Sequence, residues 1–139
     1  MNERELYQPL IKGANAEGWL LWRVKDGTYG KNPFDISGVA PDGRAVGFEV
    51  KKLIRIREDQ PIGWSVFESH QLAYLKAYQK HGGHAIMGFY GTSDNRLILV
   101  RYDELRNPKA LLETYQMVEL KKDKEIWTGW SKYEMLGRP

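Results

Sequence analysis

The stretch that decides the fold is PFDISGVAPDGRAVGFEVKK, residues 33–52. In both halves of it apolar residues alternate with polar or small ones, which predicts two β-strands. The halves are joined by Pro41-Asp42-Gly43, which suits a three-residue hairpin loop with a left-handed residue at the glycine. With this loop Ala40 pairs with Arg44. Counting back along the strands gives the pairs Ile36–Phe48 and Asp35–Glu49.

The predicted register places two carboxylates, Asp35 and Glu49, opposite each other on one face of the hairpin. Directly opposed Cβ atoms are roughly 4.5–5.5 Å apart, and like charges there are destabilising unless something compensates. A divalent cation would compensate. Lys51 lies two residues beyond Glu49 and therefore shares its face.

Two carboxylates beside an ammonium group are typical of phosphodiester hydrolysis. Mg²⁺ binds to one or two carboxylates and to phosphate, lowers the pKa of a bound water and offsets charge on the phosphate. Lys51 can orient the attacking water or stabilise that charge. A second interpretation stays open from spacing alone, in which these are ordinary charged residues on a solvated sheet face.

The composition indicates one globular domain. The chain has 139 residues, 42% of them hydrophobic and 12% aromatic, and no apolar run approaches the length of a membrane span. The polar N-terminus, residues 1–5, does not resemble a signal peptide. The absence of cysteine excludes disulfides and thiolate zinc sites, so we expect a reducing, cytoplasmic location. The net charge of +3 permits nucleic-acid binding without requiring it.

A helix is predicted over residues 3–17, because Leu6, Leu10 and Ala14 form one apolar stripe. Glu3 continues this stripe and can reach a site on the sheet. Alternatively it is a solvated first-turn acid that interacts favourably with the helix dipole, or it precedes a helix that begins near Pro9.

Basic residues near the hairpin are candidates for phosphate contacts. These are Lys31, Lys52, Arg55 and Arg57, although the two arginines could instead pair with Glu58 or Asp59. Residues 121–139 form a basic and aromatic C-terminal tail. This tail can bind nucleic acid. Alternatively, as we favour, it packs onto the rest of the domain or onto a partner subunit.

The rest of the chain predicts further alternation of helices and strands. Ser65 and Glu68 match a capping box, so a helix is expected from there to His81. Strands are expected over residues 19–24, 84–90, 96–102 and 117–120, and a helix over 108–115. The order α-β-β-β-α-β-β-α-β predicts an α/β or α+β domain, a mixed sheet with helices on its faces.

These residues together resemble the PD-(D/E)XK nuclease superfamily, in a stretch covering roughly residues 3–105. Pro33-Phe34-Asp35 and Glu49-Val50-Lys51 match its two motifs. The segment FESHQLAYL, residues 67–75, is similar to the helix after the catalytic motif in RecU-type Holliday junction resolvases, which opens with a His-Gln pair. The chain has little room for the basic arm and stalk of those enzymes, so junction specificity does not follow from the resemblance.

The resemblance implies a restriction-endonuclease-like fold with an αβββαβ core and a Mg²⁺-dependent DNA endonuclease, in which Mn²⁺ substitutes. Asp35, Glu49 and the carbonyl of Val50 would hold the metal, assisted by Glu3. Lys51 would act on the water or phosphate, and Gln71 would position the water or Lys51. The substrate would be branched or duplex DNA, in recombination, repair or phage DNA processing. Because resolving a junction needs two nicks, a homodimer is expected. The alternatives are a non-catalytic nucleic-acid-binding module on the same fold and a protein that binds a partner through its tail.

Overall fold

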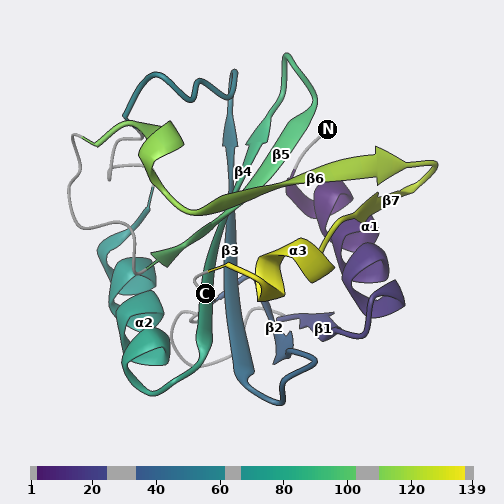
Figure 1. Ribbon diagram of the computed structural model, residues 1–139, viewed down its shortest axis with the longest axis vertical. Helices are drawn as coiled ribbons and strands as arrows, with labels where there is room; N and C mark the ends of the chain where they lie inside the picture. Colours follow the sequence, from purple (N-terminus) through teal and green to yellow (C-terminus); the bar gives the residue numbers. More distant parts are fainter. Residues whose placement is uncertain (1–2, 25–33, 62–66, 103–109, 137–139) are drawn as a thin grey trace.

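The computed structural model describes residues 3–24, 34–61, 67–102 and 110–136, without the side chains of residues 3 and 4 (Figure 1). The described residues form a mixed seven-stranded sheet in sequential order. Its strands are β1 Leu20–Arg23, β2 Ile36–Val39, β3 Ala45–Leu53, β4 His84–Gly91, β5 Arg96–Arg101, β6 Met117–Asp123 and β7 Ile126–Thr128. The helices are α1 Glu3–Ala16, α2 Ser69–Lys80 and α3 Ser131–Glu134, with a short 3₁₀ turn, η3, at Leu112–Thr114.

The central pair of strands, β3 and β4, is parallel, and the other neighbouring strands are antiparallel. Parallel neighbours require a crossover, and α2 provides it. The observed order begins α-β-β-β-α-β, which confirms the predicted core and the mixed sheet flanked by helices.

The hairpin between β2 and β3 has the predicted register. Ile36 pairs with Phe48, and the Ala40 N–H donates to the Arg44 carbonyl at 2.9 Å. The loop closes with the Gly43 N–H donating to the Ala40 carbonyl at 2.9 Å, and Gly43 has φ of 85°. This left-handed conformation favours glycine, which explains why the loop chemistry fixes the register.

Helices α1 and α2 lie on opposite sides of the central strands (Figure 1). On the α1 side, Leu6, Leu10 and Ala14 pack against Phe48 and Val50 of β3, as the predicted stripe requires. The helix includes Glu3 and continues through Pro9, so it does not begin at the proline. Side chains alternate along a strand, so Glu49 and Lys51 extend toward the opposite side, where α2 lies.

Close backbone contact fixes α1 inside the curled sheet. A Cβ atom added to Gly13 would lie 1.7 Å from the carbonyl oxygen of Trp127 on β7, so only glycine permits this approach. Just after α1, the Glu17 carboxylate accepts hydrogen bonds from the N–H groups of Gly129, Trp130 and Ser131, at 2.9–3.3 Å. These contacts attach the C-terminal segment to the first helix.

Two predicted helices differ from the structure. Helix α2 begins at Ser69, and its capping box uses Glu68 and Gln71 in place of the predicted Ser65 and Glu68. The sequence pattern favoured the earlier pair, because serine is a preferred N-cap residue and glutamate is not; Ser65 itself lies outside the described residues. In the described part of the segment 108–115, only η3 is helical, so that prediction was wrong.

The aromatic residues of the C-terminal segment are part of the core. Trp127, Trp130 and Tyr133 are buried, and Trp130 contacts Trp19 with ring centroids 5.5 Å apart. The lysines of this segment, Lys121, Lys122 and Lys124, are exposed. The strand β7 and the helix α3 were not anticipated, because neither is longer than four residues.

Candidate active site

Asp35 and Glu49 lie together where the hairpin opens. Asp35 immediately precedes β2, and its position opposite Glu49 continues the register of the Ile36–Phe48 pair. Glu49 is only 1% exposed. Its Oε1 accepts a hydrogen bond from the Asp35 N–H at 3.1 Å, while Asp35 Oδ2 accepts one from the Val50 N–H at 3.4 Å. The two acids are therefore fixed to each other's backbone across the hairpin.

The other oxygen of Glu49 is held by α2. Gln71 Nε2 donates to Glu49 Oε2 at 3.0 Å, and Gln71 Oε1 accepts from the Glu68 N–H at 3.0 Å. Because the amide oxygen is engaged at the helix N-terminus, the amide nitrogen is oriented toward Glu49. The predicted role of Gln71 was to position water or Lys51. Its observed hydrogen bond instead positions a carboxylate, a long-range contact that no local sequence pattern encodes.

Burial and a like charge make Glu49 difficult to ionise. Burial, together with the negative charge of Asp35 and a hydrogen bond to its side chain, raises the pKa of Glu49 from an ordinary value of 4.5 to about 9. The positive charge of Lys51 and the hydrogen bond from the Asp35 N–H lower this pKa but do not cancel the increase. Without a cation, Glu49 is therefore protonated at neutral pH.

The donor set fits a hard cation. The described residues contain no cluster of three or more His, Cys, Asp or Glu side chains, so they do not supply a site of the zinc type. Mg²⁺ needs fewer protein ligands, since one or two carboxylates suffice and water completes its shell. The N–H and C=O of one strand residue point to the same side. The Val50 carbonyl therefore points to the edge where its N–H meets Asp35.

Lys51 lies on the same face of the sheet as Glu49, as predicted, and this face is the one that α2 covers. Its Nζ is 5.9 Å from the ring centroid of Phe67, which is buried just before α2. A cation over an aromatic face is attracted to the ring, so Phe67 restrains the ammonium group near the two acids. The neighbouring His70 pairs with Glu68 at 3.2 Å.

The remaining predicted residues lie further away or outside the described part. Glu3 is the first residue of α1, and its side chain is not described; Lys31 falls in the segment 25–33, which is also outside the description. Lys52, Arg55 and Arg57 are exposed and line an open pocket of about 770 Å³ at the end of β3. Glu58, one expected partner of the arginines, instead pairs with Arg96.

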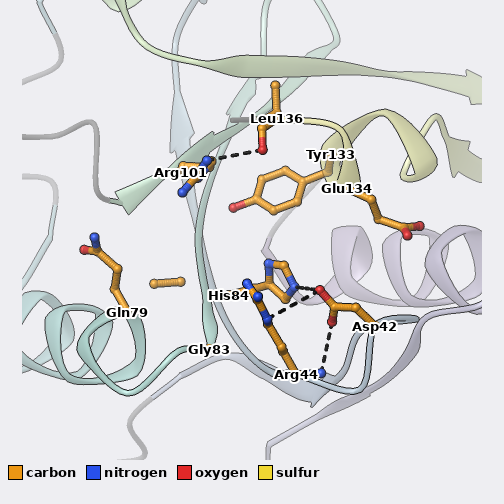
Figure 2. Close-up of a pocket in the computed structure, with 10 residues that line it drawn as sticks. Asp42, Arg44, Gln79, Gly83, His84, Arg101, Tyr133, Glu134 and Leu136 are labelled. Atoms are coloured by element: carbon orange, nitrogen blue, oxygen red, sulfur yellow. Dashed lines mark hydrogen bonds and ion pairs between the residues drawn. The ribbon is translucent and has the colours of Figure 1, made fainter. Parts of the chain in front are cut away.

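Sequence reasoning missed a second polar pocket, of about 240 Å³, at the opposite end of β3 and β4 (Figure 2). His84 Nε2 lies 2.8 Å from Asp42 Oδ2, and Figure 2 shows both beside Arg44 and below Tyr133. Burial tends to raise the pKa of Asp42, but the Arg44 N–H and His84 outweigh it and hold that pKa below its ordinary value. No local sequence pattern indicates this pair, since Asp42 is typical of a turn residue and His84 of the start of a strand.

Comparison with known proteins identifies the fold. No known protein-family model matches the chain, and no curated protein matches it. A solved structure does match: Hjc, a Holliday junction resolvase from the archaeal hyperthermophile Archaeoglobus fulgidus. The fold of this chain resembles that of Hjc. The TM-score is 0.58 at 12% sequence identity, over 95% of this chain and 98% of Hjc. This likeness confirms the nuclease-like fold class expected from the sequence. Among the described residues no helix is long and apolar enough to cross a membrane.

Proposed function

We propose that this protein is a metal-dependent DNA endonuclease of the PD-(D/E)XK type, which hydrolyses phosphodiester bonds with Mg²⁺ or Mn²⁺. The observation that carries the proposal is the pair of carboxylates fixed across the hairpin, one of them buried and with its pKa raised to about 9. A buried acid in this condition is costly unless a cation binds, and raised pKa values in such positions are a mark of functional sites.

In this proposal each residue has a distinct role. Asp35, Glu49 and the Val50 carbonyl bind the metal, with Glu3 assisting. The metal, when bound, supplies an activated water and positive charge near the phosphate. Lys51 orients the attacking water or stabilises negative charge that develops on the phosphate oxygens. Gln71 is a positioning residue, because it acts through its hydrogen bond to Glu49.

The proposed substrate is branched DNA, with cleavage resembling that of a Holliday junction resolvase in recombination, repair or phage DNA processing. Support comes from the fold shared with Hjc and from the likeness of residues 67–75 to RecU-type resolvases. Lys52, Arg55 and Arg57 provide exposed positive charge at the end of β3. Two symmetric nicks require two active sites, so we propose that the protein is a homodimer. We also propose that it acts in the cytoplasm.

The test is cleavage of four-way junction, linear duplex and single-stranded DNA with and without Mg²⁺. We expect Mg²⁺-dependent nicking of the junction, and a loss of at least about 100-fold in Asp35→Asn and Glu49→Gln. Asp123→Asn and Glu125→Gln, at exposed acids remote from the hairpin, are the matched controls and should cut like the wild type. Folded Asp35→Asn and Glu49→Gln proteins that cut at the wild-type rate would refute the mechanism.

The second candidate is a non-catalytic DNA-binding module on the same fold. The observation that favours it is the lack of a third acidic ligand among the described residues. It predicts DNA binding that does not depend on metal and no cleavage under any condition. In that case Lys51→Ala would change only the salt-sensitive affinity.

A further inference from the structure

Ile54 is the most exposed large hydrophobic residue in the described part of the chain, with 82% of its surface accessible. It directly follows β3, the strand that carries Glu49 and Lys51. It also lines the open pocket formed with Lys52, Arg55 and Arg57. An isolated exposed isoleucine is common on protein surfaces, so its backbone and its surroundings decide whether it has a role.

The backbone around Ile54 is held rigidly. Its carbonyl accepts hydrogen bonds from both the N–H and the hydroxyl of Ser93, at 2.9 and 2.6 Å. On either side, the Thr92 N–H donates to the Leu53 carbonyl at 2.9 Å, and the Ile56 N–H donates to Asp94 Oδ2 at 3.0 Å. Ile56 is buried in the core and so holds the chain segment that follows Ile54 against the domain. The turn between β4 and β5 therefore presents a stiff, β-branched side chain to solvent.

The charge around Ile54 is positive. Lys52, Arg55 and Arg57 are exposed, and no carboxylate of the described residues forms an ion pair with any of them. Of the acids nearby, Glu58 pairs with Arg96 and Asp94 accepts the Ile56 N–H, whereas Asp59 is exposed and forms no ion pair with the described residues. An apolar side chain beside cations that have no acidic partner among the described residues complements DNA, a polyanion with apolar base surfaces inside it.

We propose that Ile54 is a wedge that inserts between bases at a branch point in DNA, while Lys52, Arg55 and Arg57 bind the flanking phosphates. Apolar side chains used in this way unstack a base step and kink the duplex. A branch point has bases that are already imperfectly stacked, so insertion there costs less than in a continuous duplex. The inference deepens the proposed function, on which it rests, by assigning a residue to the recognition of branched substrates.

The position of the wedge sets a geometric expectation. Ile54 is five residues beyond Glu49, which at about 3.3 Å per strand residue separates them by about 16 Å. This corresponds to roughly five base pairs along one strand of a duplex. Cleavage is therefore expected several nucleotides from the distorted step and not directly at it.

The experiment measures base unstacking without cleavage. A four-way junction carries 2-aminopurine at the branch point, and its fluorescence is recorded on titration with protein in EDTA. We expect the wild type to raise the fluorescence several-fold. Ile54→Ala should abolish the rise and weaken junction binding about tenfold more than duplex binding, whereas Ile54→Phe retains the rise. Met135→Ala removes a side chain that is 63% exposed and far along the chain, and it should behave like the wild type.

Two outcomes overturn the inference: a full fluorescence rise with Ile54→Ala, and no DNA binding by the wild type. If the full rise is accompanied by a loss of dimer in Ile54→Ala, measured by light scattering, the side chain belongs to a contact between copies. A wild type that unstacks the junction but never cuts it with Mg²⁺ would support the wedge and refute the nuclease. Failure of the two proposals is thus distinguishable.

Discussion

Glu49→Gln should stabilise the metal-free protein at neutral pH. The pKa of Glu49 is raised to about 9 in the folded state from an ordinary 4.5. The folded state therefore retains a proton that the unfolded state releases. Stability from this group is fully present below about pH 4.5 and is lost as the pH rises toward 9. Glutamine does not titrate, so the stability of the Glu49→Gln variant does not fall with pH for this reason.

The magnitude follows from the shift and from the hydrogen bonds. At about 1.4 kcal/mol per pH unit, ionising the unfolded state costs the wild type roughly 3 kcal/mol by pH 7. Glu49 accepts one hydrogen bond at each oxygen, from Asp35 and Gln71. A glutamine amide has only one acceptor atom, so one of these bonds is lost at a cost of about 1 kcal/mol. The variant should therefore be more stable than the wild type by roughly 2 kcal/mol at pH 7, with no advantage near pH 4.5.

The assay is urea denaturation of both proteins between pH 4.5 and 9, in EDTA and in Mg²⁺, with Glu125→Gln as the control at an exposed acid. In EDTA the stability difference should grow with pH. Mg²⁺ should stabilise the wild type and leave Glu49→Gln nearly unchanged, because the bound cation favours the ionised carboxylate. A difference that stays constant or shrinks from pH 5 to 8 would refute the reasoning.

Three further predictions concern the fold. Glu17→Gln weakens the charged acceptor of three backbone N–H groups, and we expect a loss of about 2 kcal/mol in urea denaturation; an unchanged midpoint would contradict this account of the C-terminal attachment. Gly13→Ala places a methyl group against the Trp127 carbonyl and should destabilise by about 3 kcal/mol or more, unlike Lys12→Ala on the exposed face of α1. Asp42→Asn should be less stable than the wild type at pH 7. Because the pKa of Asp42 is lowered, the difference should vanish as the pH falls through that pKa, and a difference that persists in acid would assign it to packing.

The hairpin was predictable because its signals are local. The loop Pro41-Asp42-Gly43 has one favoured geometry, and the period of two in each strand then determines every pair, including the one that brings Asp35 to Glu49. The buried stripe of α1 was predictable for the same reason, since Leu6, Leu10 and Ala14 recur at the helical period.

Features that depend on contacts distant in sequence were not predictable. The hydrogen bond from Gln71 to Glu49 joins residues 22 positions apart, and the depth of burial that raises the pKa of Glu49 results from packing α2 over β3. In sequence, the aromatic residues of the C-terminal segment are compatible with nucleic-acid binding and with packing onto the rest of the domain or a partner subunit, which we favour. The packing of Trp130 against Trp19 distinguishes the two.

The central claim is that Asp35 and Glu49 hold the metal with which the protein cuts DNA. The most direct measurement is anomalous diffraction from a crystal soaked in Mn²⁺. The account predicts a peak between the two carboxylates, within about 2.5 Å of an oxygen of each and on the side of the Val50 carbonyl. A crystal that binds Mn²⁺ elsewhere, or in which both Glu49 oxygens keep their hydrogen bonds to Asp35 and Gln71 with no peak beside them, would contradict it.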